Sequence, residues 1–253
     1  MSQRVLVTAG ASGIGREIVQ AFAANGAKVF VCDIDAPALD SLVKDLPDVM
    51  TKVCDISKRE DIEQMVAFGV DALGGLDVLV NNAGIAGPTA PIEEIDPNDW
   101  EKVVQINLNG TFNVTRLAIP HLKKSNAGVI INMSSVAGRF GYASRSPYST
   151  TKWGLIGFTK TLSIELGEYG IRANAILPGA VEGARIQKVF EGRAQLSGQT
   201  VEEVRQDSMA NQSIKRLVDP RDIAALAVFL ASDYGKSISG QMLPIDNDMQ
   251  KAS

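Results

Sequence analysis

The chain has 253 residues, of which 45% are hydrophobic and 21% charged, a balance typical of a globular protein with a large buried core. A net charge of −4 at pH 7 argues against nucleic acid or an anionic membrane as the main partner. No stretch has the ~20 apolar residues that a membrane helix needs, and an apolar run starts too early for a signal peptide, so we expect a cytoplasmic protein.

Apolar runs alternate with helical patterns along the chain. The runs predict strands at residues 4–8, 28–32, 49–54, 77–81, 128–133, 172–176 and 241–245. Helices are expected between them at about 13–25, 36–46, 58–73, 97–124, 148–169 and 219–231. This order predicts one α/β domain over residues 1–253, with a doubly wound, seven-stranded parallel sheet between two layers of helices. A polar stretch at about 183–215 interrupts the alternation and predicts a helical insertion.

A glycine-rich turn, Thr8-Ala9-Gly10-Ala11-Ser12-Gly13-Ile14-Gly15, follows the first predicted strand. Glycines let a backbone approach a pyrophosphate, and the N-terminus of the next helix supplies N–H groups and a positive dipole. Because the turn follows the first strand of an alternating fold, it predicts a dinucleotide site. The expected contact residues are Gly10, Ser12, Gly13, Ile14 and Gly15.

Aspartates follow the second and third predicted strands. Asp33 lies about 20 residues after the turn, where a carboxylate accepts hydrogen bonds from the ribose hydroxyls and repels a 2′-phosphate. No Arg or Lys flanks it, so we expect NAD(H) to be favoured over NADP(H). Asp55 is a candidate acceptor for the adenine amino group, with Ile56 against the ring. Either aspartate alone would be read as an ordinary loop residue.

Cysteine and histidine are too few for several common chemistries. Cys32 and Cys54 each precede an aspartate and suit small buried residues at strand ends, not a disulfide framework or a metal site. The single histidine, His121, cannot supply a His-based metal site or a Ser/His/Asp triad. Acid–base chemistry must therefore use other residues, and we expect no metal.

Tyr148 and Lys152 are four residues apart in a predicted helix, which places both on one face. A free tyrosine titrates near ~10. A fixed ammonium nearby favours the phenolate and lowers that pKa toward the working range. The pair is therefore a candidate acid–base site, although the same spacing is common on ordinary helix surfaces.

In combination these motifs resemble the short-chain dehydrogenase/reductase family, in its compact branch. The likeness covers essentially the whole chain and rests on the turn at 8–15, Asn82-Ala83-Gly84, Asn107, Ser134-Ser135, Tyr148 with Lys152, and Pro178-Gly179. It implies a Rossmann-fold, NAD-binding domain and a homotetramer or dimer.

The resemblance implies a role for each matched residue. In that family the serine 13 residues before the tyrosine is catalytic, which identifies Ser135 rather than Ser134. Ser135 would hydrogen-bond the substrate oxygen. Tyr148 would exchange the hydroxyl proton, and Lys152 would lower the tyrosine pKa and bind the nicotinamide ribose. Asn107 would hold a water that relays protons from Lys152; outside the family it would be a helix-interior residue bonded to backbone, and Ser135 a turn serine. The remaining cofactor contacts implied are Asn82, Ala83, Gly84, Pro178, Gly179 and Val181.

Residues 183–215 and the loop 136–147 are expected to select the substrate. They contain Arg139, Arg145, Arg185, Lys188 and Arg193. An arginine near the chemistry can pair with a carboxylate or phosphate, which makes an anionic substrate one hypothesis. Interleaved glutamates favour the plainer interpretation of a solvated helix face.

Three positions depart from the family pattern. Ala9 replaces a glycine, which would cost free energy if the position needs positive φ, unless Gly10 compensates. Gly183 stands where many members have a threonine that helps to hold the carboxamide. Residues 245–248, Ile-Asp-Asn-Asp, replace the common Asp-Gly-Gly ending, which bears on contacts between subunits.

The sequence thus predicts an NAD-dependent enzyme that interconverts a secondary alcohol and its ketone, with a small-molecule substrate. One alternative is a reductase of 3-oxoacyl thioesters of acyl carrier protein or CoA, which would normally use NADPH; Asp33 argues against it. Another is a non-catalytic dinucleotide-binding sensor, which has no chemical need for Ser135, Tyr148 and Lys152. A dehalogenating relative would carry Arg at position 152.

Overall fold

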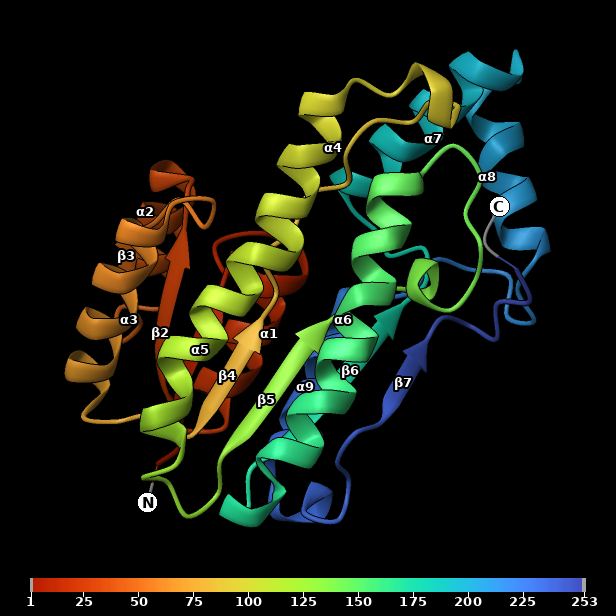
Figure 1. Cartoon of the computed structure of the whole chain (residues 1–253). Helices are drawn as coiled ribbons and strands as arrows, with labels where there is room; N and C mark the ends of the chain where they lie inside the picture. Colours follow the sequence, from red (N-terminus) through yellow and green to blue (C-terminus); the bar gives the residue numbers. More distant parts are fainter. Residues whose placement is uncertain (1, 252–253) are drawn as a thin grey trace.

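A computed structural model describes residues 2–251 and contains seven parallel strands in one sheet, ordered β3-β2-β1-β4-β5-β6-β7 (Figure 1). The strands are β1 (Arg4–Thr8), β2 (Lys28–Asp33), β3 (Met50–Val53), β4 (Val78–Asn81), β5 (Val129–Met133), β6 (Arg172–Pro178) and β7 (Met242–Ile245). All seven predicted strands are confirmed. The order reverses between β1 and β4, the point where ligands bind in doubly wound sheets.

Helices cover both faces of the sheet. They are α1 (Gly13–Ala24), α2 (Ala36–Asp45), α3 (Arg59–Leu73), α4 (Pro97–Val104), α5 (Thr111–Leu122), α6 (Ser146–Glu165), α7 (Ala184–Ser197), α8 (Val201–Ala210) and α9 (Pro220–Ala231). Buried side chains of α1, α2 and α9 pack on one face, and those of α3, α5 and α6 on the other. The doubly wound, three-layer Rossmann architecture is therefore confirmed.

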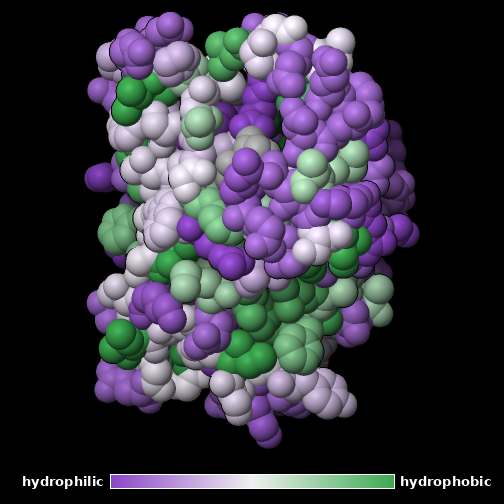
Figure 2. Space-filling model, turned by 90° about the vertical axis from the view of Figure 1, so that its right-hand side faces the viewer, coloured by the Kyte–Doolittle hydropathy of each residue, from purple (hydrophilic) through white to green (hydrophobic). Residues whose placement is uncertain are grey.

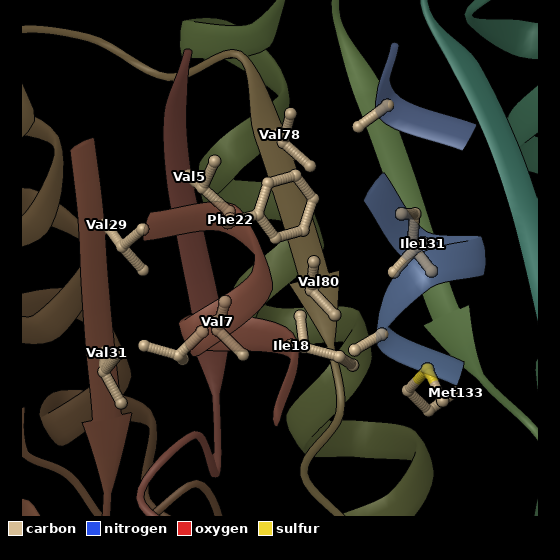
Figure 3. Close-up of a cluster of buried hydrophobic side chains, with 14 of the residues drawn as sticks. Val5, Val7, Ile18, Phe22, Val29, Val31, Val78, Val80, Ile131 and Met133 are labelled. Carbon is tan, nitrogen blue, oxygen red and sulfur yellow. The ribbon is translucent and has the colours of Figure 1, made fainter. Parts of the chain in front are cut away.

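Alternate residues of the inner strands supply the two halves of the core. Val5 and Val7 of β1 face α1, where they contact the cluster of Ile18 and Phe22 (Figure 3). Leu6, between them, faces the opposite cluster. Each such side chain contributes about 1.5–3 kcal/mol when fully buried. Burial on both faces explains why the strands are apolar without alternation.

The helix predicted over 97–124 is present without a break over residues 97–122, but its middle is not α-helical. Between α4 and α5 the chain forms a π-helical segment, Gln105–Gly110 (η2). Single π turns inside α-helices are often found at functional sites. At its end, a Cβ added to Gly110 would lie 2.7 Å from the carbonyl oxygen of Ile56, so the two backbones approach closely because this residue is glycine.

The polar stretch forms helices α7 and α8 beyond the carboxyl end of β6, as expected (Figure 1). A parallel bridge between Val181 and Val218 brings the two ends of this stretch together. Phe190, Ala194 and Val204 form its own apolar cluster. Figure 2 shows a hydrophilic surface over these helices and an apolar area lower down, at the height of β7. Within residues 2–251, no helix is long and apolar enough to span a membrane.

Candidate active site

A cavity of about 630 Å³ lies at the carboxyl ends of the strands. Its walls come from the segments after β1 to β6 and from α6, α7 and the C-terminal segment. All predicted site residues line it except Gly10 and Asn107: Ser12, Gly13, Ile14, Gly15, Asp33, Asp55, Ile56, Asn82, Ala83, Gly84, Ser135, Tyr148, Lys152, Pro178, Gly179 and Val181.

The glycine turn leaves the start of α1 available to a ligand. Ser12 precedes the helix in an extended conformation without a side-chain cap, and the first turn has no acidic residue. The first N–H groups of a helix have no partner within it and favour an anion. A Cβ at Gly15 would lie 2.2 Å from the carbonyl oxygen of Ala9, so no other residue fits there. These features fit a dinucleotide pyrophosphate.

At the start of the glycine turn, Ala9 and Gly10 occupy different environments. Ala9 has φ = 50°, in the left-handed region, and lines the cavity. Gly10 lies beneath the turn, where an added Cβ would be 2.7 Å from Cγ1 of Val31. Gly10 does not line the cavity, and its predicted contact with the cofactor stays a prediction. The positive φ of this turn thus falls on Ala9 and not on Gly10.

The carboxylate of Asp33 is held in place by the turn. It accepts hydrogen bonds from the backbone N–H groups of Ala11 at 3.1 Å and Asp35 at 3.2 Å, and it forms no ion pair within the described part of the chain. Asp55, after the neighbouring strand, accepts from the hydroxyl of Ser57 at 2.7 Å. Both carboxylates face the cavity and keep oxygen lone pairs for a ligand.

Asn82 joins the ends of β1 and β4. Its amide nitrogen donates to the carbonyl oxygens of Ala9 at 2.9 Å and Thr8 at 3.2 Å. The hydroxyl of Thr8 accepts in turn from the backbone N–H groups of Asn82 and Ala83, both at 3.0 Å. The turn is thereby fixed to the neighbouring strand end, as expected for an asparagine that braces backbone.

The two serines after β5 differ in what they contact. Ser134 donates to the carbonyl oxygen of Lys152 at 2.8 Å. Ser135 Oγ accepts from the N–H of Ala137 at 3.1 Å, which leaves its own proton free to donate. A Cβ at Gly138 would lie 2.7 Å from both the Lys152 carbonyl oxygen and Ser134 Oγ, so glycine lets this segment pack tightly on α6.

Tyr148 and Lys152 lie one turn apart on α6, as predicted. Lys152 Nζ is 5.5 Å from the centroid of the Tyr148 ring and donates to the carbonyl oxygen of Met133 at 2.7 Å. Only 3% of Lys152 is exposed. Burial, and then the charge of Arg185, lower the pKa of Lys152 from 10.5 to about 7.

Two of the five cationic residues proposed for substrate selection reach the cavity. Arg145 and Arg185 line it, whereas Arg139, Lys188 and Arg193 do not. Arg193 instead stacks over Tyr142, with its Cζ 5.0 Å from the ring centroid.

A model of the family "short chain dehydrogenase" matches residues 3–194. The chain belongs to this family. It is 38% identical over 246 residues to D-beta-hydroxybutyrate dehydrogenase of Cupriavidus necator, covering 95% of each chain. It is 36% identical over 248 residues to 3-oxoacyl-[acyl-carrier-protein] reductase of Thermotoga maritima, covering 96% of each.

Solved structures of the family agree with the fold. An actinorhodin polyketide ketoreductase with NADPH has a TM-score of 0.93 at 33% identity, over 97% of this chain and 96% of that one. An NAD+-bound xylitol dehydrogenase has a TM-score of 0.93 at 28% identity, over 96% and 97%. This short-chain dehydrogenase/reductase is thus an enzyme, an oxidoreductase acting on CH–OH groups, with a fold that binds nicotinamide dinucleotides.

Asn107 of this short-chain dehydrogenase/reductase is fully buried and does not line the cavity. Its amide exchanges two hydrogen bonds with the backbone of Ile85, at 2.8 and 3.1 Å, and donates to Thr151 Oγ1 at 3.1 Å. The side chain therefore fixes the loop after β4 to α6. Its backbone carbonyl oxygen accepts from Thr111 Oγ1 at 3.0 Å. The predicted water relay stays a prediction.

The other departures from the family pattern have local explanations. Gly183 has φ = 141°, which a threonine would adopt only with strain. Asn247 and Asp248 have φ of 58° and 56°, and Asn and Asp are the non-glycine residues most tolerant of this region. Asn247 also donates to the carbonyl oxygen of Arg216 at 2.7 Å, which anchors the turn.

Further residues of this short-chain dehydrogenase/reductase also line the cavity. Tyr142, Val189 and Ser208 lie in the segments expected to select the substrate, whereas Ala86 and Met249 were missed by sequence reasoning. Met249 comes from beyond the last strand and packs with Val136 and Ala180. Tyr142 had a usable signal, because it is an aromatic residue in a loop already expected to select substrate.

Proposed function

We propose that this enzyme interconverts a secondary alcohol and its ketone with NAD(H), and that Tyr148 is the acid–base group. The observation that carries the proposal is the convergence of Tyr148, Lys152 and Ser135 on the cavity that also receives Asp33 and the glycine turn. A proton-transfer group and a hydride carrier must both reach one carbon–oxygen bond. A cavity shared by Tyr148 and the dinucleotide turn is consistent with that requirement.

Each residue has a separate task in this proposal. When bound, the nicotinamide supplies or takes up the hydride. Ser135 donates its free proton to the substrate oxygen and so orients it. Tyr148 Oη takes the alcohol proton during oxidation and returns one during reduction. Lys152 Nζ holds the ribose beside Met133 and, when protonated, places its charge next to the Tyr148 ring. The side chain of Asn107 positions the loop after β4. We propose that its backbone carbonyl oxygen binds the water that relays protons from Lys152.

The NAD(H) preference rests on Asp33 at the end of β2, whose carboxylate has no cationic partner within residues 2–251. A 2′-phosphate placed there would meet a like charge. Ser12, Gly13, Ile14 and Gly15 would receive the pyrophosphate. Asp55 and Ile56 would receive the adenine, and Asn82 to Gly84 with Pro178, Gly179 and Val181 would surround the nicotinamide half.

Reduction of a 3-oxoacyl thioester is the second candidate function. The 36% identity to the acyl-carrier-protein reductase favours it, and the charge of Asp33 opposes the NADPH that such a reductase would normally use. A non-catalytic sensor is disfavoured because Ser135, Tyr148 and Lys152 are all present.

We further propose one domain over residues 1–253, a cytoplasmic location and a homotetramer or dimer. The edge strand β7 supports assembly, since Met242 is 45% exposed there and an apolar area lies at its height (Figure 2).

Substitution of Tyr148→Phe tests the proposal. The variant keeps the ring but lacks the proton, so we expect turnover to fall by roughly 1,000-fold or more, while NADH binding, followed by its fluorescence, stays nearly unchanged. Substrates would come from an NADH-formation screen of alcohols, polyols, hydroxy acids and hydroxyacyl thioesters. Retained turnover in the variant would refute the role of Tyr148.

A further inference from the structure

Arg145 is buried next to Tyr148. It directly precedes α6, lines the cavity and is 3% exposed. Its Cζ lies 5.4 Å from the centroid of the Tyr148 ring and 5.8 Å from that of Tyr142. A guanidinium is rarely this buried unless an opposite charge pairs with it.

The protein partners of Arg145 are neutral. Nη1 donates to Thr89 Oγ1 at 2.8 Å, and Nη2 donates to the carbonyl oxygen of Ala86 at 2.9 Å. Nε is buried and has no hydrogen-bond partner among the residues that the structure describes. These bonds use two of five N–H donors and leave the charge uncompensated. The side chain is thus only partly satisfied by the protein.

The surrounding charges add to the positive potential. Arg185 also lines the cavity, with Nη2 2.8 Å from the carbonyl oxygen of Gly84. Burial lowers the pKa of Arg145; Tyr142 and Tyr148 oppose this, and the charges of Arg193 and Arg185 lower it further. None of these three arginines joins an ion pair within residues 2–251.

Acidic side chains do not offset this cluster inside the cavity. Asp33 and Asp55 line it at the ends of β2 and β3, on the far side of the switch point. Glu182 also lines it but is exposed and forms no ion pair in the described part of the chain. The end of the cavity around Tyr148 therefore combines the reacting hydroxyl with an excess of positive charge.

We propose that Arg145, supported by Arg185, binds a carboxylate of the substrate, so that the enzyme acts on a short hydroxy acid and the corresponding oxo acid. This inference rests on the proposed function and names its substrate class. Arg145 and Tyr148 lie one helical turn apart, so one small molecule can place its carboxylate at the first and its hydroxyl at the second. The planar guanidinium fork matches a carboxylate.

The plainer role for Arg145 is to pin the loop at 86–89 to α6. Both roles are compatible with the two hydrogen bonds, but only one depends on the charge of the substrate. A purely structural arginine would affect acidic and neutral substrates alike. The decisive quantity is therefore the ratio of kcat/KM for a hydroxy acid to that for its uncharged methyl ester.

The experiment measures NADH formation with four-carbon 2- and 3-hydroxy acids, their methyl esters, 2-butanol and a phosphorylated secondary alcohol. We expect one of the acids to exceed its ester by roughly 100-fold, the effect of one charge-assisted pair. Arg145→Gln should lower that acid-to-ester ratio by a similar factor, mainly through KM, and Arg145→Lys should restore part of it. Lys188→Gln, which removes an exposed positive charge of α7 outside the cavity, should leave the ratio unchanged.

The inference is overturned if esters, neutral alcohols or the phosphorylated alcohol match or exceed the acids, or if Arg145→Gln slows acid and ester equally. Either result leaves the proposed function intact, because Tyr148-dependent turnover would remain. If no compound turns over, binding of the acids to the Tyr148→Phe variant with NAD+ is measured by calorimetry. Binding that is lost in the Tyr148→Phe, Arg145→Gln double variant supports the inference. Absence of binding to Tyr148→Phe refutes it.

Discussion

Lys152 and Met133 are joined by a 2.7 Å hydrogen bond from the ammonium to the carbonyl oxygen at the end of β5. The bond fixes the ammonium where β5 meets α6, beside the ring of Tyr148. It does not remove the cost of burying a charge, since the pKa of Lys152 falls to about 7. We therefore expect buried Lys152, which the proposed chemistry needs, to lower the free energy of unfolding.

Lys152→Met should make this cost visible through pH. Between the folded pKa of about 7 and the unfolded value of 10.5, the unfolded chain binds more protons, so the free energy of unfolding rises with pH in that window and is lowest below it. The variant lacks this dependence. In urea denaturation without added cofactor, its advantage over the wild type should be larger at pH 6 than at pH 9, by about 2–3 kcal/mol. Lys188→Met, on the exposed side of α7, is the control. Parallel curves of unfolding free energy against pH for wild type and Lys152→Met would contradict the prediction.

Asp33→Ala should shift the cofactor preference. Removing the carboxylate removes both the acceptor for ribose hydroxyls and the repulsion of a 2′-phosphate, so the ratio of kcat/KM for NAD+ over NADP+ should fall by roughly 10-fold or more. Asp35→Ala is the matched control, because Asp35 caps α2 through Ala38 in the same loop. A wild-type enzyme that already prefers NADP+ would exclude the assignment.

Ala9→Gly should stabilise the protein. A non-glycine residue in the left-handed region costs roughly 1–2 kcal/mol, which the greater flexibility of unfolded glycine partly offsets. We expect a gain of up to about 1 kcal/mol in urea denaturation. Gly10→Ala should do the opposite, since its Cβ would lie 2.7 Å from Val31. Destabilisation by Ala9→Gly would show that the alanine side chain supports the turn.

Asn107→Leu should destabilise the protein by about 2–4 kcal/mol, because it leaves the backbone N–H and carbonyl of Ile85 without partners. Asn109→Ala in the same π-helical segment is exposed and should stay within about 0.5 kcal/mol of the wild type. Thermal and urea unfolding compare the two, and equal stability would mean that the loop has other support.

The sheet and the crevice could be predicted because their signal is local and repeated. The central strands are mostly apolar runs, and polar residues such as Asp33 and Ser135 lie at or just after their carboxyl ends. Parallel strands bring those ends to one edge, so the sequence order alone predicts that the residues converge.

Other features depend on geometry that the sequence does not carry. The π-helical segment has the same apolar pattern as a continuous helix. The positive φ of Ala9 follows from the path of the turn, and Met249 reaches the cavity only through tertiary packing. The interleaved glutamates suggested solvated arginines, whereas Arg145 lies inside without a carboxylate.

The bridge between Val181 and Val218 makes the segment of α7 and α8 a candidate for grafting. Its two ends meet at one place, where Glu182 N–H donates to Val218 and Val218 N–H donates to Ala180. Its helices pack on each other through their own cluster around Phe190. Exchange of this segment between relatives could alter one wall of the cavity while Ser135, Tyr148 and Lys152 keep their positions, so new substrate ranges could arise by recombination.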